Sequence, residues 1–310
     1  MFYNARNCNI KIGDTDMDYI SFGNGNKSLV IIPGLGDALK TVKGSAVTFA
    51  LMYKLFAKDY KVYVFSRKNK LKQDCSTRDM ATDLADVMNQ LNITKAFVLG
   101  VSQGGMIAQY LAIDYPELVE KLVLAVTLCQ PNETSKSVIS NWLLLAKEKD
   151  FKQIFIDTAE KTYTERKLKT YRPFYSILSK LTEPKNLDRF IIQATACLTH
   201  NALDEISKIQ CPTFVIGGDN CLLYTSPWRK RSRALWADAP ASKRRAPSSR
   251  MAVRLPPRAP PPEAPRIWEK PNRPALSPPP GRAPLLCANA PLRLVRGRKM
   301  GYNKSAYRCV

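Results

Sequence analysis

Lys95-Ala-Phe-Val-Leu-Gly-Val-Ser-Gln-Gly-Gly-Met106 is the stretch of sequence on which the fold depends. Its apolar run from Phe97 to Leu99 is typical of a short strand buried in a sheet. The residues from Met106 to Ile113 predict a helix. That helix is expected to end near Tyr115, because the proline that follows disfavours helical backbone in the residue before it. A strand, a tight turn and a helix are therefore predicted in immediate succession.

The turn between this strand and this helix matches the pattern G-x-S-x-G at Gly100, Ser102 and Gly104. A serine on so tight a turn is held in strained backbone, and a side chain larger than hydrogen at either glycine would collide with its surroundings. Such a turn exposes the Ser102 hydroxyl above the sheet and points the N–H of Gln103 into the same space. The flanking strand and helix favour a nucleophilic serine over a chance match.

Strands and helices alternate on both sides of this turn. Apolar patterning predicts strands over residues 9–12, 17–22, 28–32, 61–65, 97–99, 121–126 and 211–217, and helices over residues 46–56, 77–91 and 106–113. Ser76 and Asp79 have the spacing of a capping box at the start of the second of these helices. Because strands alternate with helices, the predicted fold class is α/β, with a doubly wound, mostly parallel sheet.

Residues 132–208 interrupt this alternation. Helices are predicted over residues 138–147, 151–159, 174–181 and 187–198, with no strand between them. An all-helical insertion of this kind is most simply a helical cap over one edge of the sheet. Its aromatic residues either line a substrate pocket or only pack the cap helices against one another; they are Trp142, Phe155, Tyr163, Tyr175 and Phe190.

The composition of the chain changes at residue 221. Residues 222–310 contain 20 Lys and Arg against 3 Asp and Glu, a net of +17 out of the +22 of the whole chain. This segment is rich in proline and poor in large apolar residues, a composition that predicts disorder. We therefore expect the first part of an α/β core (1–131), a helical cap (132–208), a return strand of the core (209–220) and a disordered Arg/Pro-rich tail (221–310).

The tail has two interpretations. It could be an Arg-rich arm that binds nucleic acid, with its three tryptophans stacking on bases. Alternatively it is foreign to the rest of the chain, because Lys, Asn, Ile and Phe before residue 221 use AT-rich codons whereas Arg, Pro and Ala after it use GC-rich ones. The run from Cys221 to Pro227 also resembles a translated sequencing-adapter junction. We favour the second interpretation, and expect only non-specific nucleic-acid binding through the basic charge.

The sequence also bears on compartment and cofactors. The N-terminus has no apolar leader segment, and no run of about 18 apolar residues occurs. The eight cysteines are scattered without a C-x-x-C pair, which fits thiols in a reducing cytoplasm better than a disulfide framework or a zinc site. The expectation is a cytoplasmic protein with no membrane partner, no metal and no cofactor.

Together these features resemble the α/β-hydrolase fold family over roughly residues 9–220. The resemblance is carried by a strand ending in Pro33-Gly-Leu-Gly36, the turn at Ser102, the helical cap, and a strand ending in Gly217-Gly-Asp-Asn220. Within the family, the chain is most similar to the small capped esterases, lactonases and peptidase-like hydrolases.

The resemblance implies Ser102 as the nucleophile. It also implies an oxyanion hole formed by the N–H groups of Leu35 and Gln103. Two fixed backbone donors beside the serine stabilise the negative charge of a tetrahedral intermediate, and the loss of one such donor typically costs about 10²–10³ in rate.

The family's catalytic triad runs Ser, then Asp or Glu, then His, and this sequence departs from that pattern. The position implied for the acid holds Cys221, and the nearest carboxylate is Asp219. The one histidine of the chain, His200, comes before the acid's strand, in the cap. Asp219 as the acid and His200 as the base stay open, beside the simpler reading of His200 as a polar residue near a helix C-terminus.

These features predict a serine hydrolase that acts on a small ester, lactone or amide through an acyl-enzyme. The chain as written is expected to lack turnover, because it is truncated before the triad acid and histidine and joined to an unrelated tail. The alternative is a non-catalytic protein of the same fold that binds a small ligand. A nucleic-acid-binding protein that works through the tail is a third hypothesis, but it explains neither the turn at Ser102 nor the loop Pro33-Gly-Leu-Gly36.

Overall fold

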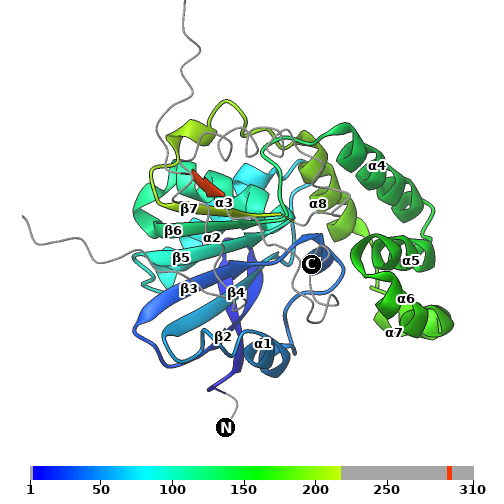
Figure 1. Ribbon diagram of the computed structural model, residues 1–310, viewed down its shortest axis with the longest axis horizontal. Coiled ribbons are helices and arrows are strands. Elements are labelled where there is room, and N and C mark those ends of the chain that lie inside the picture. The colour runs from blue at the N-terminus through cyan, green and yellow to red at the C-terminus, as the bar shows by residue number, and fades with distance from the viewer. Residues whose placement is uncertain (1–2, 218–291, 295–310) are drawn as a thin grey trace, which may run out of the picture. The chain divides into compact units, whose positions relative to one another are not determined.

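The computed structural model describes residues 3–217 and 292–294, whose strands form one mixed sheet (Figure 1). The strands are β1 (Arg6–Ile12), β2 (Thr15–Phe22), β3 (Lys27–Ile32), β4 (Tyr60–Lys68), β5 (Ala96–Val101), β6 (Val119–Ala125), β7 (Thr213–Ile216) and β8 (Leu292–Leu294). They lie in the order β1-β2-β4-β3-β5-β6-β7-β8. The pairs β1–β2 and β2–β4 are antiparallel, whereas the other five neighbouring pairs are parallel. The predicted fold class, a doubly wound and mostly parallel sheet, is confirmed.

Helices α2 (Thr77–Gln90) and α3 (Gln103–Asp114) pack on one face of the sheet and enclose the larger core. In α2 the residues Met80, Leu84 and Met88 are buried, as their helical spacing predicts. The Ser76 hydroxyl accepts a hydrogen bond from the backbone N–H of Asp79, and the Asp79 carboxylate accepts one from the backbone of Ser76. The predicted capping box is therefore formed.

The opposite face of the sheet is covered unevenly. Helix α1 (Ala46–Met52) packs there against residues of β2, β3 and β4. Along β5, burial alternates, so that Val98 is buried while Phe97 and Leu99 are only half-buried. The predicted strand is present, but the expectation that Phe97 to Leu99 are all buried is wrong for Phe97 and Leu99. A parallel strand needs helices over both faces to be fully buried, and within residues 3–217 α1 reaches only the margin of β5.

The cap contains one helix more than predicted. Its helices are α4 (Glu133–Lys147), α5 (Phe151–Thr162), α6 (Glu165–Tyr171), α7 (Tyr175–Thr182) and α8 (Asp188–Thr199), with no strand among them (Figure 1). The additional helix is α6, which spans seven residues and buries only Leu168. Two turns with a single buried residue carry too little hydrophobic periodicity to be recognised in a sequence.

The aromatic residues of the cap pack its helices together. Trp142 and Phe190 are buried in one core that also contains Met106 of α3. Phe155 contacts the edge of the Tyr175 ring, with 6.0 Å between ring centroids. Of the two interpretations of these side chains, the geometry favours packing over a pocket lining.

Several predictions fall on residues 218–291 and 295–310, outside the described residues. They include Asp219, Cys221 and the disorder of the tail, of which only Leu292–Leu294 are described. No helix of the described residues combines the length and apolar character needed to cross a membrane.

Candidate active site

Ser102 sits on the strained turn that its sequence pattern predicts. Its φ is 53° and its ψ is −118°, and it forms the N-cap of α3. Its backbone N–H donates to the carbonyl of Ala125 at 2.9 Å, and its carbonyl accepts from the Thr127 hydroxyl at 2.7 Å. Positive φ in a residue with a side chain costs of order 1–3 kcal/mol and persists only where neighbouring structure holds it. Ala125, the last residue of β6, and Thr127, two residues later, supply that support.

The glycines around Ser102 are required by contact. A Cβ added at Gly100 would lie 2.4 Å from the carbonyl oxygen of Gly104. One added at Gly104 would lie 2.0 Å from the carbonyl oxygen of Ile32, at the end of β3. The collisions expected from the sequence are therefore real, and the second of them involves the loop that carries Leu35.

The two backbone donors implied for the oxyanion hole have the same local setting. Leu35 is the first residue of the short 3₁₀ helix η1 (Leu35–Ala38), and Gln103 is the first residue of α3. The N–H of a first helical residue has no acceptor within its own helix, so it is available to a ligand. A Cβ added at Gly34 would lie 3.3 Å from Cβ of Ser102. The structure thus brings the loop before Leu35 against the serine.

A buried polar cluster lies behind this loop, and sequence analysis missed it. The carboxylate of Asp37 accepts from the Ser66 hydroxyl at 2.5 Å, from the Arg67 N–H at 3.1 Å and from Nη2 of Arg189 at 2.8 Å. The Asp37 side chain is 0% exposed and that of Arg67 is 3% exposed. One signal could have revealed the pair. Asp37 follows β3, Arg67 is the penultimate residue of β4, and parallel neighbours end at the same edge of a sheet.

Arg67 joins this cluster to the serine turn. Its Nη2 donates to the carbonyl of Pro33 at 2.5 Å and to Oε1 of Gln103 at 2.8 Å. Burial lowers the pKa of Arg67 to about 10, an effect that the nearby Asp37 carboxylate opposes. The guanidinium therefore keeps its charge at neutral pH. The Gln103 side chain in turn donates from Nε2 to the carbonyl of Gln193 in α8 at 2.8 Å.

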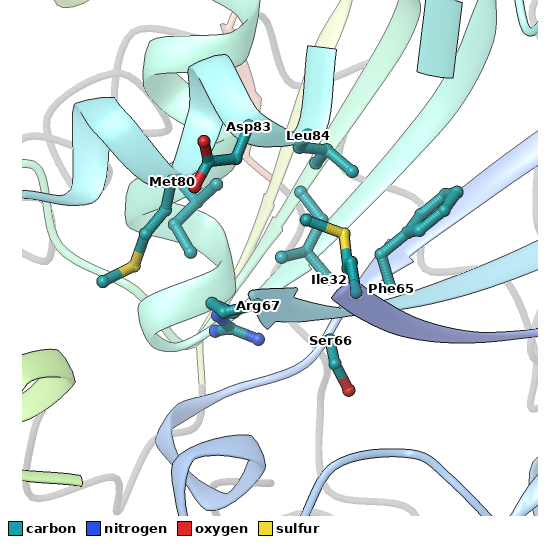
Figure 2. A pocket seen from close by; sticks show the side chains of 9 residues that line it. Ile32, Phe65, Ser66, Arg67, Met80, Asp83 and Leu84 are labelled. Carbon is teal, nitrogen blue, oxygen red and sulfur yellow. The ribbon is translucent and has the colours of Figure 1, made fainter. Parts of the chain in front are cut away.

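A small cavity lies between the sheet and α2 (Figure 2). It is bounded by Met80, Asp83 and Leu84 of α2 on one side and by strand residues that include Ile32 and Arg67 on the other. Its volume of about 10 Å³ corresponds to the space of one water molecule. Ser102 does not line it. The cavity is too small for an organic substrate and does not serve the serine.

His200 is placed away from the serine turn. It follows α8, is 2% exposed, and its Nδ1 lies 2.9 Å from the Thr77 hydroxyl. Its ring contacts the edge of the Tyr110 ring, with 5.2 Å between centroids. Tyr110 is eight residues along α3 from Ser102, about 12 Å at 1.5 Å per residue. The packing of His200 therefore involves the middle of α3 and the start of α2.

The burial of His200 leads to a prediction about pH. Burial lowers the pKa of this histidine to about 4, whereas the unfolded chain has a histidine pKa of about 6.5. At a pH between these two pKa values, the histidine binds a proton in the unfolded state but stays neutral in the native state. The contribution of His200 to the free energy of unfolding should therefore be constant above about pH 6.5 and fall by up to about 3 kcal/mol as the pH drops to 4.

Because the chain has one histidine, its ring proton gives a single NMR resonance whose titration measures this pKa directly. Urea unfolding of the wild type and of His200→Phe across the same pH range isolates the contribution of the ring from that of the carboxylates. A midpoint near 6.5 in the native protein would contradict the prediction.

The described residues do not include a triad acid or base beside Ser102. Asp219 and Cys221 lie outside them. Within residues 3–217, no histidine or carboxylate is hydrogen-bonded to the Ser102 hydroxyl. The same residues hold no cluster of three or more His, Cys, Asp or Glu side chains suited to a metal ion. The site as described consists of Ser102 on its strained turn, the first helical residues Leu35 and Gln103, and the buried Asp37–Arg67 cluster behind them.

The sequence of this chain is similar to those of known hydrolases. A family model described as alpha/beta hydrolase fold matches residues 27–224. The chain is 28% identical over 134 residues to Epoxide hydrolase 1 of Caenorhabditis elegans, across 43% of this chain and 33% of that protein. It is 24% identical over 220 residues to RutD of Pseudomonas syringae, provisionally named a carbamate hydrolase, across 66% of this chain and 78% of that protein. The matches span about a third of the length of the curated epoxide hydrolases.

Solved structures share the fold at low sequence identity. MGS-M2, an alpha/beta hydrolase enzyme from a deep-sea metagenome library, superposes with a TM-score of 0.62 at 18% identity, over 72% of this chain and 83% of its own. The enol-lactonase of Burkholderia xenovorans superposes with a TM-score of 0.57 at 16% identity, over 68% of this chain and 81% of its own. At such identities the likeness concerns the arrangement of the backbone.

Proposed function

This chain belongs to the α/β-hydrolase fold family, and from this premise we propose that it is a serine hydrolase acting on a carboxylic ester, lactone or amide. The observation that supports the proposal is the conformation of Ser102, which has a φ of 53° at the N-cap of α3. Strain of this kind is retained at functional sites, where it exposes a nucleophile.

The proposed chemistry follows from the groups around the serine. The Ser102 hydroxyl oxygen attacks the carbonyl carbon of the substrate, and the carbonyl oxygen becomes negatively charged. The N–H groups of Leu35 and Gln103 stabilise that charge. The hydroxyl proton passes to solvent or to an added base. Collapse of the intermediate then breaks the bond to the alcohol or amine, which takes up a proton as it leaves, and an acyl group remains on Ser102. Water then releases the acid and restores the serine.

A carbonyl substrate suits a serine nucleophile better than an epoxide does. An acyl group on serine is an ester, which water hydrolyses with help from the same oxyanion hole. Opening an epoxide with serine would leave an ether, which has no carbonyl carbon for water to attack. The esters, lactones and carbamates named for several relatives share the required carbonyl group.

Ser102 needs a base, and His200 is not included in this mechanism because its neighbours are Thr77 and Tyr110. Without a triad base, a serine hydroxyl is a poor nucleophile at neutral pH. We expect turnover close to the residual level of about 10³–10⁴ over water that an oxyanion hole and binding alone provide. The chain as written is therefore proposed to be a weak catalyst or an inactive one.

The test is acylation of Ser102 in the full chain. The substrate is 4-nitrophenyl butyrate, and imidazole at about 100 mM serves as an external base. We expect a butyryl group on the tryptic peptide that contains Ser102. Mass spectrometry detects this adduct, and Ser102→Ala is the control that should remove it. If a folded chain shows no adduct at Ser102 with or without imidazole, the serine is not a nucleophile.

A second candidate function is a non-catalytic protein of this fold that binds a small carbonyl compound. It is favoured by the lack of a histidine or carboxylate at the Ser102 hydroxyl within residues 3–217. It predicts tight ligand binding without product, and an affinity that Ser102→Ala leaves unchanged. Calorimetric titration of both proteins with one ligand separates the two functions.

A further inference from the structure

The two expected oxyanion donors belong to segments far apart in the sequence. Leu35 follows β3, and Gln103 begins α3 after β5. Donors of an oxyanion hole act at 2.7–3.1 Å from the developing charge, and a displacement of about 1 Å costs about 10²-fold in rate. Something must therefore hold the two segments at a constant separation.

Arg67 is the side chain that contacts both segments. One nitrogen, Nη2, donates to the carbonyl of Pro33, two residues before Leu35, and to the side chain of Gln103. An Nη2 group carries two N–H bonds at a fixed angle in the guanidinium plane. The two acceptors match these two donors, so the rigid group restricts their relative position.

We propose that Arg67 is a positioning residue that holds the Leu35 and Gln103 donors at the separation that an oxyanion requires. This inference rests on the proposed function, because the oxyanion hole is part of that function. Arg67 does not touch the reacting atoms in this account. It acts through the Pro33 carbonyl and the Gln103 side chain.

The charge of the cluster acts in the same direction. Within the described residues, Arg67 and Arg189 share the single carboxylate of Asp37, with nitrogen–oxygen distances of 3.7 Å and 2.8 Å. The cluster therefore has one net positive charge, fixed in a buried place next to the two donor segments. Fixed positive charge in a site sheltered from water stabilises negative charge that develops nearby.

The arginine cannot be replaced by lysine without loss. A lysine ammonium has three donors on a flexible stem, and it does not present two N–H bonds in a rigid plane. It would keep the charge of the cluster while leaving the separation of the two segments less well defined. Arg67→Lys thus keeps the positive charge but loses the rigid pair of donors, whereas Arg67→Met loses both the charge and the donors.

The experiment measures kcat and KM for 4-nitrophenyl acetate in the full chain, in Arg67→Met, in Arg67→Lys and in Arg78→Met. Arg78 is the matched control, because it pairs with Asp114 and Glu205 outside the site. We expect Arg67→Met to lower kcat by about 10–100-fold with KM changed less than about threefold. The kcat of Arg67→Lys should lie between those of the wild type and Arg67→Met, and Arg78→Met should keep the wild-type kcat. Because an unfolded fraction would also lower the apparent kcat without changing KM, each kcat is divided by the folded fraction of that variant, measured by urea unfolding.

A second measurement keeps the inference separate from the proposed function. The backbone amide resonances of Leu35 and Gln103 should shift in Arg67→Lys and Arg67→Met and stay in place in Arg78→Met. If the wild type hydrolyses no ester and also forms no adduct at Ser102, the proposed function fails, and these resonances alone decide the role of Arg67. A folded Arg67 variant with unmoved resonances, or with the wild-type kcat, overturns the inference. If Arg67→Met does not fold, Arg67→Lys carries both measurements.

Discussion

Asp37→Asn is expected to lower the free energy of unfolding by about 3–5 kcal/mol, the cost of removing one partner from a buried ion pair. Asparagine has almost the shape of aspartate but carries no charge. The buried guanidinium of Arg67 and the partly buried one of Arg189 would lose their shared counter-charge, since the Asp37 side chain is 0% exposed and pairs with both. Urea unfolding followed by tryptophan fluorescence measures the loss.

Asp114→Asn is the matched control for this change. Asp114 also pairs with an arginine, Arg78, at 2.7 Å, but the two side chains are 25% and 42% exposed. Water screens such a pair, so the expected loss is only about 0–1 kcal/mol. Equal unfolding midpoints for the two variants would show that burial of the Asp37 cluster contributes nothing to stability.

Gly104→Ala is expected to cost about 3 kcal/mol, at the upper end for an added methyl group in a packed site. The new Cβ would lie 2.0 Å from the Ile32 carbonyl oxygen and 2.6 Å from that of Pro33. Both are backbone atoms, so no side-chain rotation can relieve the contact. The N-terminus of α3 must move away from the loop that carries Pro33 and Leu35 by about 1 Å, which should slow any acylation of Ser102 by about 10²-fold.

Gly36→Ala is the corresponding control, in the same loop. A Cβ at Gly36 meets no atom within 4 Å, so its effect should stay within about 0.5 kcal/mol. Urea unfolding and the rate of Ser102 acylation are measured for both variants. Similar results for Gly36→Ala and Gly104→Ala would contradict the close approach of the loop and the serine turn.

Local patterns in the sequence predicted most of the fold. The alternation of strands and helices, the capping box at Ser76 and the strained turn at Ser102 each depend on residues within a few positions of one another. Such signals need no knowledge of the rest of the chain. The family membership follows from the same features, because their order along the chain is what defines the fold.

Two departures from prediction have a common cause. Helix α6 buries a single residue, Leu168, so its presence depends on the neighbouring cap helices and not on its own periodicity. Phe97 and Leu99 of β5 are only half-buried, although their apolar character suggested full burial. Whether an apolar residue is covered depends on which helix packs over it, and this is decided by elements distant in the sequence.

The sequence by itself therefore determined the α/β class, the helical cap and the identity of the serine on its turn. Only the tertiary structure revealed the cluster behind the loop that carries Leu35, whose members Asp37 and Arg189 are 152 positions apart. It alone also revealed the packing of His200 against Thr77, 123 positions away. The physical reason is that backbone strain, capping and hydrophobic periodicity act between near neighbours and leave a local pattern. A buried ion pair or a shared hydrogen bond forms wherever folding brings two side chains together, and it leaves no local pattern in the sequence.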